Sequence, residues 1–180
     1  MGTVTVHERS FEVYLPEEAI QQRVKELAAQ INVDYTGKKP LFIAVLNGSF
    51  MFAADLFKNL TIEAELCFIK LASYKGMKSS GKVVTSIGLE EDIYGKDVII
   101  VEDIVDTGKT LHNFLPKLEH QQPRSLKIAT LLHKPAATKY PLVLDYVGFD
   151  IPNKFVVGYG LDYDGLGRNF KEIYQVVSAD

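Results

Sequence analysis

The sequence has very little cysteine, no long apolar run and no strong excess of charge. A single cysteine, Cys67, excludes an internal disulfide, and no CxxC pair or His/Cys cluster suggests zinc. No apolar run approaches the roughly 20 residues that span a bilayer, and the polar N-terminus has no signal-peptide pattern. With a net charge of −3, nothing indicates non-specific binding to nucleic acid. We therefore expect a cytoplasmic protein without membrane or nucleic-acid partners.

What is present is the composition of an ordinary globular protein. The 180 residues are 47% hydrophobic and 24% charged, which is enough for one domain with a real core. No internal repeat, low-complexity tract or linker divides the chain, so we expect a single domain over residues 1–180. Cys67 lies in an apolar run (LCFI), and we expect it to be a buried core residue.

Apolar periodicity predicts strands that alternate with helices. Apolar residues recur at helical spacing from Ile20 to Ile31, behind a proline and two acids that are typical of a helix start. Further helices are expected at 50–60 and 110–118, where Pro116 should shorten or kink the last one. The expected strands are 41–46, 62–71, 83–87, 98–101, 125–132, 142–149, 155–159 and 173–177. This order predicts an α/β fold with a mainly parallel sheet, in which ligands bind at the carboxyl ends of the strands.

Polar residues of unusual density follow the buried strand 98–101. The segment VEDIVDTGKT carries three carboxylates, Glu102, Asp103 and Asp106, and then opens a helix. The first N–H groups of a helix lack partners and lie at the positive end of its dipole. Thr107 and Thr110 add hydroxyl donors, so this segment suits a phosphate monoester. A second polar break, Asn47–Ser49, follows strand 41–46 and should lie at the same edge of the sheet.

Two other interpretations of this segment are weaker. A nucleoside-triphosphate P-loop needs a glycine five residues before Gly108, where Asp103 stands. An ordinary helix start with acids near its positive end explains one carboxylate, but not the ordered set. Ionised carboxylates only accept hydrogen bonds. Adjacent Glu102 and Asp103 could therefore hold the two hydroxyls of a ribose whose 5-phosphate reaches Thr107–Thr110.

EDIVDTGKT resembles the phosphoribosyl-pyrophosphate motif of type I phosphoribosyltransferases. Further motifs occur in that family's order, and they resemble most the members that use the 6-oxopurines hypoxanthine and guanine: VLNGSFMFAADL, LASYKG, LLHKP, VGFDIPNKFVVGYGLDYDG and GRNF. The resemblance implies a central parallel sheet flanked by helices, a small hood built from both chain ends, and a mobile lid loop. It also implies transfer of ribose 5-phosphate from phosphoribosyl pyrophosphate to purine N9 in a salvage reaction.

The resemblance implies specific roles for residues near the base and the sugar. Asp106 matches the family's acid or base near purine N7, and Lys134 its donor to the oxygen at C6. His133, beside Lys134, is taken as non-catalytic. Phe155 matches the aromatic that stacks on the purine, although a core strand is the alternative. The full set implied for the ribose phosphate is Glu102, Asp103, Asp106, Thr107, Gly108, Lys109 and Thr110, and the set for the purine is Lys134, Phe155, Val156 and Asp162.

Other roles concern pyrophosphate, metal and lid. The resemblance implies Mg²⁺ as cofactor, and the residues implied as its ligands are Glu102, Asp103 and Asp162. Asn47, Gly48, Lys70 and Arg168 are implied for pyrophosphate, and Ser73 and Tyr74 for the lid. Some relatives carry a basic residue where Asn47 stands, and Lys70 could compensate. The family's peptide before that position, here Leu46–Asn47, can be cis.

Two alternative functions stay open at this stage. One is a regulator that keeps the fold and binds nucleotide without turnover. The other is a phosphoribosyltransferase for pyrimidines, against which Lys134 and Phe155 argue. The family commonly forms dimers or tetramers, so we expect a homodimer or homotetramer that acts on small-molecule substrates.

Overall fold

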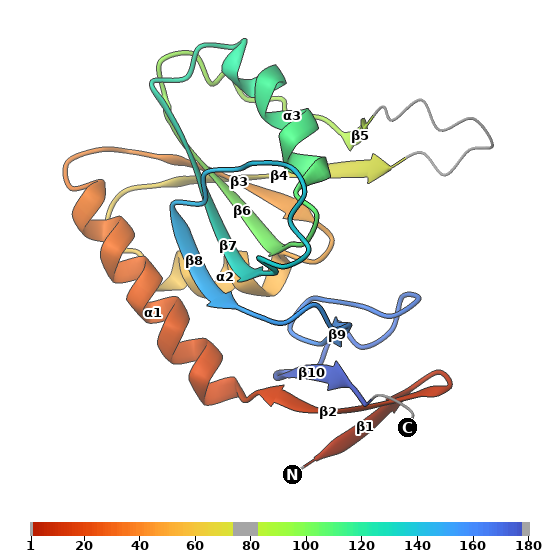
Figure 1. The fold of residues 1–180 in the computed structure, drawn as a ribbon. Helices are drawn as coiled ribbons and strands as arrows, with labels where there is room; N and C mark the ends of the chain where they lie inside the picture. Colours follow the sequence, from red (N-terminus) through yellow and green to blue (C-terminus); the bar gives the residue numbers. More distant parts are fainter. Residues whose placement is uncertain (1, 74–82, 178–180) are drawn as a thin grey trace.

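The computed structural model describes residues 2–73 and 83–177, which form two sheets (Figure 1). The larger sheet has the strand order β5-β4-β3-β6-β7-β8, and all neighbours are parallel except β5 against β4. Its strands are β3 (Leu41–Leu46), β4 (Glu65–Ser73), β5 (Val83–Ile87), β6 (Asp97–Val105), β7 (Ser125–His133) and β8 (Tyr146–Asp150). The predicted mainly parallel α/β architecture is therefore confirmed.

Helices cover both faces of the larger sheet, because side chains alternate along its buried strands. Phe42 of β3 packs with α1 (Glu17–Asp34) and α2 (Phe50–Lys58) on one face. Its neighbour Ile43 packs with α3 (Lys109–Glu119) on the other. The sheet is thus a central layer between two helical layers, and its carboxyl edge is left for loops (Figure 1).

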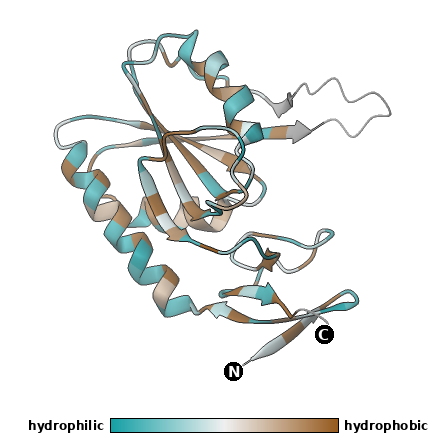
Figure 2. Ribbon diagram, viewed as in Figure 1, coloured by the Kyte–Doolittle hydropathy of each residue, from teal (hydrophilic) through white to brown (hydrophobic). Residues whose placement is uncertain are grey.

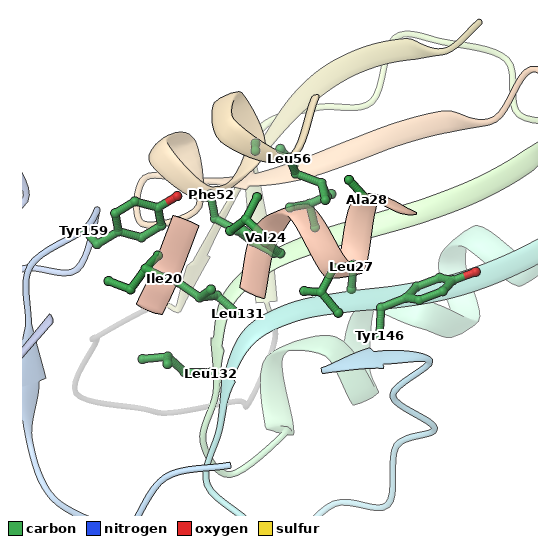
Figure 3. Close-up of a cluster of buried hydrophobic side chains, with 14 of the residues drawn as sticks. Ile20, Val24, Leu27, Ala28, Phe52, Leu56, Leu131, Leu132, Tyr146 and Tyr159 are labelled. Atoms are coloured by element: carbon green, nitrogen blue, oxygen red, sulfur yellow. The ribbon is translucent and has the colours of Figure 1, made fainter. Parts of the chain in front are cut away.

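The periodic apolar residues of α1 form the first of these interfaces. Figure 3 shows Val24 and Leu27 beside Phe52 and Leu56 of α2, and all four are at most 1% exposed. Burying such a side chain contributes about 1.5–3 kcal/mol. Figure 2 shows hydrophilic and hydrophobic residues mixed along α1, as expected for a helix with one face in water.

The smaller sheet joins the two ends of the chain. Its order is β1-β2-β10-β9, with antiparallel neighbours. These strands are β1 (Thr3–Val6), β2 (Arg9–Leu15), β9 (Val156–Val157) and β10 (Ile173–Val176). The sheet lies beside the start of α1 (Figure 1), and we refer to it as the hood. β1 and β2 were not among the predicted strands, because about half of their residues are polar. They pair with each other, and β2 also pairs with β10.

Other boundaries also differ from the predicted ones. β6 continues to Val105, so Glu102 and Asp103 lie inside the strand rather than beyond it. β8 and β9 are shorter than predicted, and β4 begins three residues later. Pro116 lies inside α3 without ending it, because it stands near the end of the helix, where a single N–H is lost. Within the described part of the chain, no helix is long and apolar enough to cross a membrane.

Candidate active site

The loop after β6 forms a small pocket at the carboxyl edge of the larger sheet. Glu102 and the run 106–111 contribute to its lining, and its volume is about 90 Å³. Gly108 precedes α3 with a φ of 81°, and a Cβ there would lie 3.0 Å from the carbonyl oxygen of Tyr140. Glycine is therefore favoured at this turn. The N–H of Lys109, the first of α3, donates to the hydroxyl oxygen of Thr107 at 3.3 Å. The positive end of this helix borders the pocket, which suits an anion.

Two neighbouring carboxylates on β6 lie beside this pocket. The Oε2 atom of Glu102 is buried and has no hydrogen-bond partner among the described residues. Burial, together with the nearby charge of Asp103, raises the pKa of Glu102 well above its ordinary range. Burial also raises the pKa of Asp103 to about 6, although Arg168 opposes this. Desolvated carboxylates of this kind are costly unless a ligand or cation compensates them.

These two carboxylates meet different neighbours. Glu102 lines the pocket formed with the loop Thr107–Thr110, which we call the phosphate loop after its predicted ligand. Asp103 lies against Gly48, where an added Cβ would come within 1.6 Å of its Oδ2 atom. Consecutive residues of a strand point to opposite sides, which explains the separation. That a single ribose diol bridges both carboxylates stays a prediction.

The turn after β3 is held between two other segments. The Leu46–Asn47 peptide is cis, as the resemblance allows. Gly48 faces Asp103 on one side, and its carbonyl oxygen lies 2.0 Å from where a Cβ of Gly160 would stand. Neither glycine could carry a side chain without displacing its neighbour. β3 and β6 are parallel neighbours, so this turn and the phosphate loop share one edge, as predicted.

Lys70 and the lid residues lie at the end of β4. Leu46 and Lys70 are register partners, so Lys70 stands beside the turn that Asn47 begins. Lys70 is half-buried. Ser73 is the last residue of β4. Tyr74 lies outside the described residues, and the lid prediction stays a prediction.

Lys134 and Asp106 come together from adjacent strands. β6 and β7 are parallel neighbours, and each residue follows the end of its strand. The Nζ atom of Lys134 lies 3.3 Å from Oδ2 of Asp106. The lysine is buried, with 6% of its surface exposed, whereas the Asp106 side chain is 48% exposed. A donor and an acceptor therefore stand side by side next to the phosphate loop.

The aromatic candidate belongs to the hood. Phe155 precedes β9 and is 40% exposed, with the edge of Tyr163 packed on it at a centroid distance of 5.5 Å. Val156 is buried in the main core, so only its backbone is available to a ligand. The alternative of a core strand thus holds for Val156 but not for the exposed Phe155, whose stacking on a purine stays a prediction. Val157 joins the hood's own core.

The remaining candidates form an ion pair near the same edge. Arg168 donates from Nη2 to Oδ1 of Asp162 at 2.7 Å and from Nη1 to the carbonyl oxygen of Gly160 at 2.7 Å. Asp162 also accepts a hydrogen bond from the N–H of Gly165. The charges of both Asp162 and Arg168 act on Asp103. The loop 158–168 between β9 and β10, which we call the hood loop, therefore lies close to the carboxyl end of β6.

The three carboxylates proposed as metal ligands do not form a metal site by themselves. Within residues 2–73 and 83–177, no group of three or more His, Cys, Asp or Glu side chains is arranged to hold an ion. The reason is that Asp162 is paired with Arg168 while Glu102 faces the phosphate-loop pocket. Mg²⁺ needs only one or two carboxylates when water and phosphate oxygens complete its shell. The orphaned Glu102 oxygen and the desolvated Asp103 fit a cation bound in that way.

Two features of the site were not predicted from the sequence. Gly160 contacts the turn at Gly48, and the glycine-rich run GYG was the available signal. Thr138 binds the backbone of both Asp106 and Lys134. No pattern marks a threonine four residues after the lysine, so this contact required the structure.

Known proteins are similar to this chain over most of its length. The family model of the phosphoribosyl transferase domain matches residues 10–164. The hypoxanthine phosphoribosyltransferase of Buchnera aphidicola subsp. Schizaphis graminum is 45% identical over 171 residues, covering 93% of this chain and 97% of that protein. The crystal structure of a hypoxanthine phosphoribosyltransferase from Staphylococcus aureus matches with a TM-score of 0.88 and 43% identity, covering 92% and 91% of the two chains.

A longer relative is matched only in part. The bifunctional protein TilS/HprT of Listeria innocua serovar 6a is 38% identical over 173 residues, which cover 96% of this chain. The chain spans 27% of the length of that relative. The fold predicted from the motifs agrees with the solved structures. On the extent of these matches, the chain belongs to the phosphoribosyl transferase domain family.

Proposed function

We propose that this chain transfers ribose 5-phosphate from phosphoribosyl pyrophosphate to N9 of hypoxanthine, and of guanine, in purine salvage. The products are IMP or GMP and pyrophosphate. The observation that carries the proposal is the pair Lys134–Asp106, 3.3 Å apart beside an anion pocket. N7 and O6 are adjacent on one edge of a 6-oxopurine. The ammonium donor matches O6, and the carboxylate matches N7 in the tautomer of the free base that carries its proton on N7.

In this proposal each group acts on one part of the reaction. Lys134 donates to the oxygen at C6, and Asp106 exchanges a proton near N7 as general acid or base. Phe155 stacks on the purine face. Glu102 and Asp103 hold the ribose and favour positive charge on the ribosyl group as its bond to pyrophosphate breaks. The phosphate loop, Thr107–Thr110, binds the 5-phosphate.

In this proposal, backbone N–H groups and positively charged side chains bind the pyrophosphate. Asn47 and Gly48 offer N–H groups, while Lys70 and Arg168 supply positive charge. We propose Mg²⁺ as cofactor. Glu102 and Asp103 would supply one or two carboxylate oxygens, with water and phosphate oxygens as the other ligands. Asp162 is the third candidate, and it is paired with Arg168 in this structure. When bound, the ion neutralises pyrophosphate charge and so stabilises the leaving group. Ser73 and Tyr74 belong to the proposed lid.

The test is a panel of bases with phosphoribosyl pyrophosphate and Mg²⁺. Nucleotide should form from hypoxanthine and guanine and hardly at all from adenine. A 6-amino group is a donor, so it would leave the Lys134 ammonium without an acceptor. The proposal fails if no 6-oxopurine is used while nucleotide still binds, because that result identifies a regulator with this fold. Turnover of a pyrimidine alone would also overturn it.

The Asp106→Asn variant tests the proton step within this panel. Asparagine keeps the size of the side chain but cannot accept a proton. Turnover should fall by roughly 10²–10⁴-fold, while the Kd for GMP should change far less. Equal losses in turnover and in nucleotide binding would show that Asp106 serves binding only.

We further propose a homodimer or homotetramer that works in the cytoplasm. A substrate with several phosphate charges does not cross a bilayer unaided, which favours that compartment. Light scattering of the purified chain measures the oligomeric state, and a monomer at micromolar concentration would contradict this part of the proposal.

A further inference from the structure

Segment 134–140 is bound tightly to the end of β6. Besides the contact between the Lys134 and Asp106 side chains, four hydrogen bonds connect the two. One of them comes from a side chain: the hydroxyl of Thr138 donates to the carbonyl oxygen of Asp106 at 3.1 Å. The other three run from the N–H groups of Lys134, Lys139 and Tyr140 to the carbonyl oxygens of Val105 and Thr107. These hydrogen bonds hold Lys134 next to Asp106.

Thr138 contacts the backbone of both members of that pair. Its Oγ1 atom lies 3.1 Å from the carbonyl oxygen of Asp106 and 3.0 Å from that of Lys134. Its N–H also binds the carbonyl oxygen of Lys134, at 3.2 Å. Movement of Thr138 would therefore change the spacing of the two side chains proposed to meet the purine edge.

His133 contacts the Thr138 hydroxyl, and Asp150 in turn contacts His133. Nε2 of His133 lies 3.2 Å from the Thr138 hydroxyl, and Nδ1 lies 2.7 Å from Oδ1 of Asp150. Strand register produces this line, since Val105, His133 and Asp150 are partners on β6, β7 and β8. The imidazole is mostly covered, with 19% of its side chain exposed.

We propose that Thr138 is a positioning residue for the Asp106–Lys134 pair, and that Asp150 and His133 hold it in place. The inference rests on the proposed function and deepens it. It assigns His133 a role without contact to the purine, which agrees with its exclusion as a catalytic base.

The proton count sharpens the proposal. The Thr138 hydroxyl has one proton, which it can give either to a carbonyl oxygen or to an unprotonated ring nitrogen. The carbonyl oxygens of Asp106 and Lys134 therefore share this one proton, at 3.1 Å and 3.0 Å from the Oγ1 atom. The His133 ring lies on the other side of the hydroxyl and limits its movement away from the two carbonyl groups.

The first experiment compares Thr138→Val with Thr138→Ser. Valine keeps the shape but removes the hydroxyl, so kcat/KM for hypoxanthine should fall roughly 10-fold, the scale of one lost hydrogen bond. The KM for hypoxanthine should rise at least three times more than the KM for phosphoribosyl pyrophosphate. Serine should restore most of the loss. Equal changes in both KM values, or no rescue by serine, would show a merely structural role and overturn the proposal.

Thr36→Val is the matched control, because the Thr36 hydroxyl also binds backbone carbonyls, at the end of α1. Its kinetic constants should equal those of the wild type. Wild-type protein without turnover of any 6-oxopurine would refute the proposed function itself. Active wild type with an unaffected Thr138→Val variant would refute only the positioning role.

The second experiment is independent of activity. Nitrogen-15 NMR of the histidine rings, with His133→Gln used to assign the signals, should show that the His133 signals shift in Thr138→Val, because the ring loses its hydroxyl neighbour. Unchanged His133 signals in that variant would mean that the ring does not contact Thr138, and that result would overturn the role given to His133.

Discussion

At the scale of single residues, Lys134 is a lysine that the fold has almost removed from water. Its exposure is 6%, and its ammonium has one carboxylate neighbour, Asp106, at 3.3 Å. A buried charge is costly unless it is paired. A purine oxygen at C6 would give the ammonium a second acceptor. In the proposed function, the burial that makes this charge costly would also make the lysine selective for a base with an oxygen at C6.

We predict that Lys134→Met impairs use of the base but not of the ribosyl donor. Methionine fills the same space without a donor. Losing a charge-assisted hydrogen bond of about 1.5–3 kcal/mol should lower kcat/KM for hypoxanthine roughly 10- to 150-fold. The KM for phosphoribosyl pyrophosphate should stay within about twofold. Steady-state kinetics with each substrate varied in turn measure both.

The exposed neighbour Lys139 provides the control for this substitution. Lys139→Met should behave as the wild type, since only its backbone binds the phosphate loop. If Lys134→Met left the profile of accepted bases and the KM for hypoxanthine unchanged, the role assigned to Lys134 would be wrong.

Cys67 shows the opposite outcome of burial, an inert group. The thiol is 7% exposed on β4, and burial, helped by the negative charge of Glu91, raises its pKa to about 12 from 9.0. The proton is thus held more tightly in the folded chain than in the unfolded one. The contribution of this thiol to the free energy of unfolding is therefore fully present below pH 9 and is lost as the pH rises toward 12.

We therefore predict that Cys67 resists alkylation in the folded protein. The thiolate is the reactive form. At pH 8.5, iodoacetamide should label native protein at least roughly 100-fold more slowly than urea-unfolded protein. Mass spectrometry measures this without ambiguity, because the chain has one cysteine. Comparable rates in both states would contradict the burial of this thiol.

At the scale of elements, the site depends on how closely three segments approach. The turn after β3 lies between the end of β6 and the hood loop, and Gly48 touches both Asp103 and Gly160. Parallel pairing of β3 with β6 brings the first two segments together. The contact leaves no room for a Cβ on either glycine.

We predict that Gly48→Ala damages both stability and activity. An added Cβ would lie 1.6 Å from Oδ2 of Asp103, so backbone or carboxylate must move. Overpacking costs about 1–3 kcal/mol, which should lower Tm by roughly 2–10 °C in a chain of this size. Turnover should also fall at temperatures where the variant is still folded, because the substitution displaces the Asp103 carboxylate. Thermal denaturation and a base assay measure the two effects.

Gly88→Ala is the matched control, because a Cβ at Gly88 meets nothing within 4 Å. Its Tm and turnover should be close to those of the wild type. A Gly48→Ala variant as stable and active as this control would mean that the turn does not approach Asp103 as described.

At the scale of the whole molecule, the hood has a small core of its own around Phe11 and Val157, but other hood residues are buried in the core of the larger sheet. Ile173 of β10 and Val156 of β9 belong to the same buried cluster as α1 and α2. Tyr159, seen with this cluster in Figure 3, donates from its hydroxyl to Asp55 of α2. The hood therefore has little independent support, and we expect it to unfold together with the sheet.

We predict that Ile173→Ala lowers the stability of the entire chain. Ile173 is fully buried, and such a truncation costs about 2–5 kcal/mol. Far-UV circular dichroism and near-UV tyrosine signals should show one shared transition at a lower Tm. Val177→Ala, at a position 44% exposed, should change Tm very little. Separate transitions for hood and sheet would contradict the shared core.

The motifs and the layer architecture were largely predictable, for a local reason. Strand β3 and helix α1 have apolar patterns that match their periodicity, and both were predicted with nearly correct bounds. The phosphate loop is contiguous in sequence, so its residues could be read together. β1 and β2 could not be predicted, because their sequences are mixed in polarity and the pairing of β2 with β10 joins residues some 160 positions apart.

The amino-acid sequence by itself determined the alternation of strands and helices in the larger sheet, the polar loop after β6 and the chemical types available at the sheet edge. These properties depend on neighbours in the chain. Only the tertiary structure decided which groups meet: Lys134 with Asp106, Arg168 with Asp162, and Thr138 with His133. Strand register and the close approach of three loops place these pairs, and neither is written in any short segment of the sequence.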